Sequence, residues 1–250
     1  MAAKGGRQIK LAKKGGGTKL KRQVAPAFWQ IKRKEKRFVV SVSPGPHPKH
    51  SAYSLALVLR DILGLTETLH EVEKIMNKNY VMVDGRSVQD PRRAVGLMDV
   101  LEVVPSNQAY RLVPIAGKQL SPISIGDDEK SLKLVKITSK ITIRAGRKQY
   151  GFHDGKTMLV DGNYNVGDTC LIEIPKLNVK DYIPLDKGVL AIVTKGENVG
   201  QIGKIEEIRD GLFSLPKRAL ISLGNRTVEL PANLIMAIGK SDSALIKVSE

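Results

Sequence analysis

The sequence predicts an α+β fold that is mostly β, with a basic N-terminal arm ahead of two or three small folded parts. Three observations support this prediction. Residues 1–37 hold 13 Lys and Arg against one acid, Glu35, and so contribute +12 of the net charge of +16. Apolar residues recur at helical spacing between residues 51 and 78. From residue 80 onward, short or alternating apolar runs are bounded by Gly and Pro instead.

The basic segment has little aliphatic periodicity, so it cannot bury enough apolar surface to offset its conformational entropy. We therefore expect residues 1–42 to be an arm that binds a polyanion, most often nucleic acid. An anionic membrane is the alternative, but no amphipathic helix or myristoylation glycine accompanies the charges. No apolar run long enough for a signal peptide or a membrane span follows, so we expect neither export nor membrane insertion.

Aromatic residues interleave with cations near the end of the arm, where Phe28, Trp29 and Ile31 precede Lys32. An indole can stack on an exposed base while the neighbouring cations hold phosphates. Trp29 can equally pin the root of the arm to a domain surface. Both interpretations stay open, and they are compatible.

The Pro-rich residues 43–48 predict a stiff hinge, and the next elements are helical. Residues 51–63 carry apolar side chains on one helical face, and Thr68 with Glu71 has the spacing of a capping box that begins a second helix. Its expected buried stripe is Leu69, Val72, Ile75 and Met76. His70, Lys74 and Lys78 share another face, which indicates either RNA contact or a favourable interaction with the helix dipole.

The remaining elements are expected to be strands. Residues 80–88 predict a hairpin around Asp84-Gly85, and residues 100–104 a further strand. Residues 135–144 alternate strictly, with Lys136, Lys140 and Arg144 on the polar face. Residues 130–153 hold seven cations and no carboxylate, which favours a phosphate-facing strand and loop over an ordinary solvated face.

The sequence offers no support for catalysis. Gly155-Lys156-Thr157 resembles the end of a nucleotide-binding loop, but Tyr150 stands where that loop needs a glycine. The four histidines lack metal-ligand spacing. We expect the single cysteine, Cys170, to be buried, which fits a reducing, intracellular setting. We therefore expect no catalytic residues, metal, cofactor or small-molecule substrate.

Residues 188–208 form two apolar runs around a loop that contains Gly196, Gly200 and Gly203. This pattern resembles the KOW motif, a strand-loop-strand unit of a small SH3-like barrel. The resemblance implies that Lys195, Asn198 and Lys204 contact RNA or a neighbouring protein. Merely structural glycines are the alternative.

Residues 80–85, Tyr-Val-Met-Val-Asp-Gly, resemble the RNA-binding domain named after bacterial small-subunit ribosomal protein four. From about residue 19 to residue 240 the order of motifs resembles the archaeal/eukaryotic-type small-subunit ribosomal protein four, the "e" type, with an archaeal-like ending after Lys240. The resemblance implies an rRNA-binding arm, a small αα-β-hairpin RNA-binding domain, a central β domain, a KOW barrel and a C-terminal tail. The expected boundaries are 1–42, 43–105, 106–175, 176–240 and 241–250.

The resemblance implies a structural constituent of the small ribosomal subunit that binds ribosomal RNA, lies beside other ribosomal proteins in the cytoplasm, and supports assembly and translation. An RNA-modifying enzyme and a KOW-type transcription elongation factor are the alternatives. The expected RNA-binding residues are Lys10, Lys13, Lys14, Lys19, Lys21, Arg22, Trp29, Lys32, Arg33, Lys34, Lys36, Arg37, His50, Lys74, Lys78, Arg86, Arg92, Arg93, Lys136, Lys140, Arg144, Arg147, Lys148, Lys195, Asn198 and Lys204.

Overall fold

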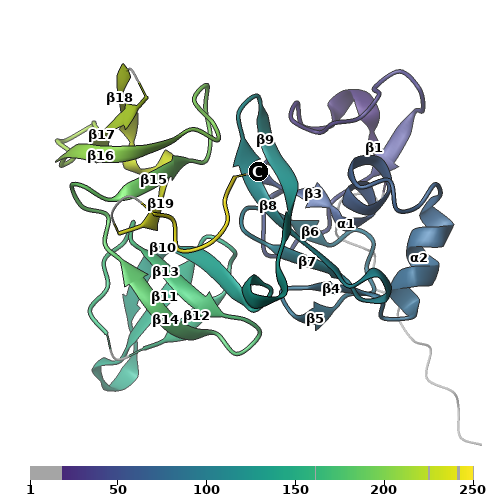
Figure 1. The fold of residues 1–250 in the computed structure, drawn as a ribbon, viewed down its shortest axis with the longest axis horizontal. Helices are drawn as coiled ribbons and strands as arrows, with labels where there is room; N and C mark the ends of the chain where they lie inside the picture. Colours follow the sequence, from purple (N-terminus) through teal and green to yellow (C-terminus); the bar gives the residue numbers. More distant parts are fainter. Residues whose placement is uncertain (1–18, 161, 225, 241–242, 250) are drawn as a thin grey trace, which may run out of the picture.

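The computed structural model describes residues 19–160, 162–224, 226–240 and 243–249, and its fold is mostly β, as predicted (Figure 1). Three antiparallel sheets of five strands each form the body of the described chain. We call them the N-terminal, central and C-terminal sheets, in chain order. Short 3₁₀ turns lie at Arg22–Val24, Lys49–Ser51, Val104–Ser106, Asp127–Glu129, Arg144–Gly146 and Ala232–Leu234.

The N-terminal sheet has the strand order β5-β4-β7-β8-β9. Its first hairpin turns at Asp84 and Gly85, whose φ angles of 51° and 70° are both positive, as an Asp-Gly turn of this kind requires. The strands are β4 (Val81–Val83), β5 (Arg86–Ser87), β7 (Val100–Val103), β8 (Gln108–Ile115) and β9 (Lys118–Ile125). The short β3 (Tyr53–Ser54) pairs with β6 (Ala94–Val95).

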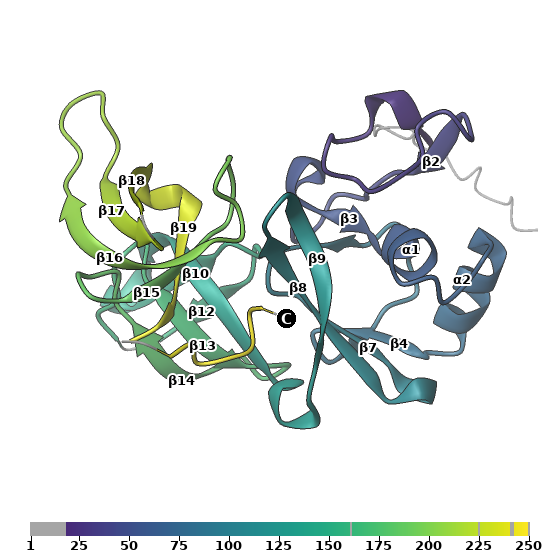
Figure 2. The same cartoon turned by 45° about the horizontal axis from the view of Figure 1, so that its top comes forward.

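Two helical segments pack beside this sheet (Figure 2). The first is α1 (Leu55–Leu57), continued by a π-helical turn at Val58–Ile62, and the second is α2 (Leu69–Asn77). The predicted capping box is present, since Thr68 Oγ1 accepts from the backbone N–H of Glu71 at 3.3 Å. Val72 and Met76 are buried, whereas Leu69 and Ile75 of the expected stripe are half-buried.

The central sheet has the order β12-β11-β10-β13-β14, and the C-terminal sheet the order β18-β17-β16-β15-β19. The central strands are β10 (Leu132–Thr142), β11 (Lys148–Phe152), β12 (Thr157–Leu159), β13 (Thr169–Glu173) and β14 (Asn178–Ile183). The C-terminal strands are β15 (Leu190–Val193), β16 (Ile202–Arg209), β17 (Arg218–Leu223), β18 (Arg226–Pro231) and β19 (Ile235–Gly239).

The N-terminal sheet is buried on both faces because successive side chains of a strand point to opposite sides. Leu101 and Leu112 join the core that contains the helices, whereas Val100 and Val113 join the core of the central and C-terminal sheets. The boundary expected between residues 105 and 106 falls between two paired strands, β7 and β8. That expected after residue 175 likewise separates the paired strands β13 and β14. Neither position marks a break in the structure.

The arm is folded from residue 19, contrary to expectation. Strand β1 (Lys19–Lys21) pairs with β2 (Phe38–Val40), closing residues 19–40 into a loop that we call the arm hairpin. Arg22 is 4% exposed, and its guanidinium donates to the carbonyl of Lys32 at 2.8 Å. Arg33 donates to the carbonyls of Ala25 and Pro26 at 3.1 and 2.9 Å. The basic composition predicted an unfolded arm, but Arg22 and Arg33 stabilise its fold by donating to backbone carbonyls of the arm itself.

Trp29 fastens the arm hairpin to the N-terminal domain. It is 2% exposed, and its Nε1 donates to the carbonyl of Ala52 at 2.9 Å. Its ring centroid lies 6.3 Å from that of Tyr53, which also packs against Phe28 at 5.1 Å. Of the two interpretations of Trp29, the structure therefore supports the pin.

The Pro-rich segment is anchored by a buried His47 and is not the free hinge that we expected, although Pro44, Gly45 and Pro48 are exposed. His47 is 4% exposed, and its Nε2 donates to Asp99 Oδ1 at 3.1 Å. Gly96 makes room for the imidazole, because a Cβ at this position would lie 2.6 Å from the ring of His47.

The buried ammonium of Lys133, on β10, joins the N-terminal and central sheets. Its Nζ lies 2.6 Å from Asp84 Oδ2, 2.6 Å from Asp99 Oδ1 and 3.1 Å from Asp154 Oδ2. Lys156 adds a second cation, 2.6 Å from Asp84 Oδ2. We call these five residues the Lys133 cluster. Asp84 and Asp99 come from the N-terminal sheet and its β6–β7 turn, so the ion pairs span the joint.

The electrostatics of the Lys133 cluster favour its charged forms. Burial alone would raise the pKa of Asp99, but the charges of Lys133 and His47 lower it far below its usual value. Burial would likewise raise the pKa of Asp154, but the positive charge of Lys133 and Lys156 outweighs burial and lowers this pKa. Three carboxylates outweigh the desolvation of Lys133 and raise its pKa.

Arg111, on the face of β8 that also carries Val113, forms a second joint between the N-terminal and central sheets. It is fully buried and donates to Glu129 Oε2 at 2.5 Å and to the carbonyl of Leu132 at 3.1 Å. It also donates to the carbonyl of Lys247 at 2.9 Å, which holds the C-terminal segment against the N-terminal sheet. Buried Ile246 and Val248 complete that contact.

Strand β10 departs from the strict alternation that we expected. Its pairing with β11 shifts between Ile137 and Ser139, so a bulge interrupts the register. Val135 and Ile137 are buried as predicted, but Ile141 is 58% exposed. The bulge turns Lys140 toward the ring of buried Tyr150, whose centroid lies 5.8 Å from Lys140 Nζ.

The loop between β15 and β16, residues 194–201, contacts the turn between β8 and β9. Gly200 has a φ of +79°, and a Cβ there would lie 2.4 Å from the backbone nitrogen of Ala116. Gly196 has a φ of +97°, but a Cβ there would meet no atom of the described chain within 4 Å. Both positions therefore need glycine for their positive φ, but only Gly200 also needs it to make room for a neighbouring loop.

We expect Lys133→Met to lower the free energy of unfolding by about 3–5 kcal/mol, because it removes the one fully buried cation that all three carboxylates share and leaves only Lys156 and His47 of the described chain to pair with them. Urea denaturation of the full chain measures this. Lys130→Met is the matched control, since Lys130 pairs with the exposed Asp127 and should contribute at most about 1 kcal/mol. Equal losses for both variants would contradict the proposed importance of the cluster.

The stability of Lys133→Met should depend on pH differently from that of the wild-type protein. The lowered pKa values of Asp99 and Asp154 contribute stability that is fully present above the unfolded-state pKa of about 3.9 and is lost as the pH falls. In Lys133→Met the buried carboxyls have less positive charge beside them and should protonate more readily, so the stability deficit of this variant relative to wild type should shrink between pH 7 and pH 4. A constant deficit across that range would argue against charge as the cause.

We expect Gly200→Ala to lower the midpoint of thermal unfolding more than Gly196→Ala does. Both substitutions strain a backbone with positive φ, at about 1 kcal/mol each, but only that at Gly200 also forces two loops apart. Similar losses for both would show that the loop contact is unimportant. Lys195→Ala, an exposed change in the same loop, should leave the midpoint unchanged.

Candidate nucleic-acid interface

The arm hairpin presents the densest set of exposed cations in the described chain. Six of the predicted residues are exposed here: Lys19, Lys21, Lys32, Lys34, Lys36 and Arg37. Arg22 and Trp29 are buried and bonded within the chain, so they are not available to contact RNA as expected. Arg33 is half-buried and holds backbone carbonyls. Lys10, Lys13 and Lys14 lie outside the described residues.

Phe38 is an exposed aromatic side chain among these cations, and the sequence reasoning missed it. It is 42% exposed, with the Arg37 guanidinium 5.3 Å and the Lys19 ammonium 5.9 Å from its ring centroid. An exposed ring flanked by cations can stack on a base while the cations hold phosphates. Its position directly after Lys36 and Arg37 was the sequence signal that pointed to it.

Helix α2 and the β4–β5 hairpin offer a second exposed set; α2 lies at the same end of the molecule as the arm hairpin, whereas β5 lies below β4, on the side away from β1 (Figure 1). His70, Lys74 and Lys78 are all exposed on α2, as their shared face predicts, and Arg86 is exposed on β5. Tyr80, which the sequence reasoning did not select, is 39% exposed, and Lys78 Nζ lies 5.8 Å from its ring centroid. This repeats the combination of cation and ring found at Phe38.

The hairpin between β10 and β11 carries a third set. Arg144 and Arg147 are exposed at its turn. Lys140 and Lys148 are half-buried and both donate to Asn163 Oδ1, at 2.9 and 3.0 Å. The bonds to Asn163 hold the two ammonium groups close together, which concentrates positive charge next to the exposed arginines.

The remaining predicted residues of the N-terminal part are more dispersed. His50 is exposed on the 3₁₀ turn Lys49–Ser51. Arg92 and Arg93 are half-buried, and the Nε atom of each is buried without a hydrogen-bond partner in the described chain.

Lys136 is half-buried, and backbone carbonyls of the chain itself hold its ammonium, so it is not the freely accessible strand residue that the alternation predicted. Its Nζ donates to the carbonyls of Ala232, Asn233 and Ile235, at 2.7, 3.2 and 2.5 Å. Burial lowers its pKa to about 8. These bonds tie β10 to the turn before β19, so the acid-free stretch of residues 130–153 is explained in part by two internally bonded lysines, the buried Lys133 and the half-buried Lys136.

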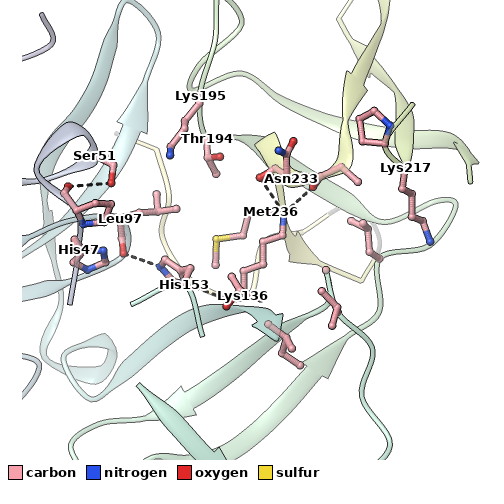
Figure 3. A pocket seen from close by; sticks show the side chains of 18 of the residues that line it. His47, Ser51, Leu97, Lys136, His153, Thr194, Lys195, Lys217, Asn233 and Met236 are labelled. Carbon is pink, nitrogen blue, oxygen red and sulfur yellow. Dashed lines mark hydrogen bonds between the residues drawn. The ribbon is translucent and has the colours of Figure 1, made fainter. Parts of the chain in front are cut away.

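A cavity of about 580 Å³ opens beside Lys136, where the three sheets meet (Figure 3). His153 lines it with both ring nitrogens engaged. Its Nε2 donates to the carbonyl of Leu97 at 3.1 Å, and its Nδ1 accepts from the backbone N–H of Lys136 at 3.1 Å. Burial and the charge of Lys133 lower the pKa of His153 to about 4, so the ring is neutral near pH 7.

The β15–β16 loop places its predicted residues in different settings. Lys195 and Lys204 are exposed, and Lys195 lies at the rim of the cavity. Asn198 Oδ1 accepts from Arg226 at 2.6 Å, so this amide already supports the fold.

The described residues contain no group of three or more His, Cys, Asp or Glu arranged to hold a metal ion. Cys170 is buried, and burial raises the pKa of its thiol to about 12. No helix among the described residues is long and apolar enough to cross a membrane. The candidate site in the described chain therefore consists of exposed cations and the aromatic rings beside them.

Comparisons with known proteins identify a family of similar proteins. Residues 106–179 match the family model described as Ribosomal family S4e, and residues 14–50 match the RS4NT (NUC023) domain. The crystal structure of the 30S ribosomal protein S4e from Thermoplasma acidophilum superimposes with a TM-score of 0.66 at 28% identity, covering 78% of this chain and 99% of that one.

Curated relatives extend the match over nearly the whole sequence. Small ribosomal subunit protein eS4 of Staphylothermus marinus is 37% identical over 253 residues, which cover 96% of this chain and 99% of that protein. The protein of the same name from Ignicoccus hospitalis is 37% identical and covers 96% and 98%. The resemblance found in the sequence is confirmed: the chain belongs to the S4e family of ribosomal proteins.

Proposed function

We propose that this chain is a structural constituent of the small ribosomal subunit that binds ribosomal RNA and lies beside other ribosomal proteins. The observation that carries the proposal is the pairing of exposed cations with exposed rings, at Phe38 and at Tyr80. Phosphates and unstacked bases are the ligands that such pairs bind. The names of the curated relatives place those proteins in the small ribosomal subunit, which supports the same role here.

The mechanism that we infer is binding by charge neutralisation on a preorganised surface. The Lys133 cluster and Arg111 hold the sheets together, so the exposed sets keep fixed positions relative to one another. A rigid body loses less conformational entropy on binding than a flexible one, and this favours a stabilising role in subunit assembly and translation. We further propose that the C-terminal sheet is a KOW-type barrel and that the protein acts in the cytoplasm.

An RNA-modifying enzyme is the first alternative. It needs a base, acid or nucleophile beside a cavity. His153 has both ring nitrogens bonded within the chain, and the Cys170 thiol is buried with a raised pKa. His153 at the cavity and Cys170, which does not line it, therefore give no support to a catalytic role.

A transcription elongation factor is the second alternative. It would use the β15–β16 loop to grip another protein. In this chain, Gly200 of that loop packs on the backbone of Ala116, so part of the loop is committed to an internal contact. This favours the ribosomal role.

The cation sets predict the salt dependence of RNA binding. Each phosphate contact contributes about 0.9 to the slope of log affinity against log salt. We expect Arg144→Gln with Arg147→Gln to reduce the slope for small-subunit rRNA by roughly 1–2, measured by filter binding across a salt series. Lys118→Gln with Lys187→Gln removes the same charge at exposed positions outside the predicted sets and should change the slope less. Equal changes would assign binding to net charge alone.

Phe38 predicts a stacking contact that is separable from folding. We expect Phe38→Ala to weaken RNA binding by about 1–3 kcal/mol while leaving the thermal midpoint unchanged, and Phe38→Trp to restore binding. In contrast, Trp29→Ala should lower the thermal midpoint, because the indole is buried and anchors the arm hairpin. Binding that is unaffected by Phe38→Ala would remove the ring from the interface.

A further inference from the structure

The cavity at the meeting point of the three sheets has an apolar floor. Leu97, from the N-terminal part, is half-buried and Val166, before β13, is 57% exposed, whereas the apolar lining residues Leu120, Ile137 and Met236 are buried. Its volume of about 580 Å³ lies within the range of sites that hold small organic ligands. A single nucleotide falls in this size class.

The polar lining is cationic. Lys136, Lys195 and Lys217 line the cavity, and the described residues that line it include no Asp or Glu, although the Lys217 ammonium lies 3.4 Å from Asp210 outside the lining. The ammonium of Lys136 is held by three carbonyl oxygens and by no carboxylate in the described chain. The charge that Lys136 places near the cavity is thus solvated by dipoles but not neutralised, which favours an anionic occupant.

Amide side chains complete the lining. Gln119 lies on β9, and Asn233 lies on the turn before β19, where Figure 3 shows it beside the cavity. Such amides can donate and accept at the same time, which matches the mixed donor and acceptor edge of a nucleobase. An apolar floor, an amide pair and a cationic rim together suit a base that carries a phosphate.

We propose that this cavity holds one unstacked nucleotide of the bound RNA, with its base against the accessible apolar side chains Leu97 and Val166 and its phosphate toward Lys195. The inference deepens the proposed function and rests on it. Sequence-specific recognition of RNA commonly uses bases that leave the helical stack and enter protein pockets. A protein segment would fill the apolar floor equally well, but it brings no obligatory anion for the lysines, so the charge favours RNA.

The test places a photocrosslinking amino acid, p-benzoylphenylalanine, at Val166, which lines the cavity and is 57% exposed. The full-length protein is assembled with small-subunit rRNA and the other small-subunit proteins, irradiated, and mapped by primer extension. We expect a crosslink to a single nucleotide. The control at Val104, 50% exposed and outside the cavity, should not crosslink to that nucleotide. A crosslink from position 166 to protein, or none at all in assembled particles, would overturn the inference.

A cavity-filling variant provides the second measurement. Val166→Trp should weaken rRNA binding roughly 5- to 150-fold, the effect of losing one base contact, while Val104→Trp should not. Thermal unfolding of both variants checks that they fold. If wild-type protein fails to bind rRNA, the proposed function itself fails. If wild type and Val166→Trp bind equally well, only the nucleotide site is lost.

Discussion

The fold depends on the burial of one ammonium group. Lys133 reaches from the central sheet into the N-terminal sheet, where Asp84 and Asp99 lie 2.6 Å from its Nζ. Removing these charges from water is costly, and the cost is offset only because each carboxylate keeps further partners: Asp84 accepts from the backbone N–H of Val100, and Asp99 from that of Gly96. The cluster therefore specifies one relative placement of the two sheets.

That placement sorts the cations of a strongly basic chain into two groups with different roles. Lys133, Lys136 and Arg111 are consumed by the joints between sheets, where carboxylates or carbonyls surround them. The exposed cations of the arm hairpin, of α2 and of the β10–β11 turn remain for a ligand. Net charge alone does not distinguish the groups, whereas burial does.

Local features were predictable from sequence, and long-range features were not. The capping box at Thr68, the turn at Asp84-Gly85 and the strands flanking the β15–β16 loop follow from patterns of a few residues. Lys136 and Trp29 were assigned to RNA or left open because a periodic pattern shows which face a residue occupies, not what covers that face. The partners of His47, Lys133 and Arg22 lie 52, 49 and 10 residues away, beyond any local pattern.

The joints between the sheets should make the described chain one rigid body before it meets RNA. Double electron–electron resonance between spin labels at Glu73→Cys on α2 and Lys187→Cys before β15 tests this most directly, since both sites are exposed and the native Cys170 is buried. We expect one narrow distance distribution that is the same in the free protein and in assembled small subunits. A broad distribution in the free protein that narrows only on assembly would contradict rigid joints.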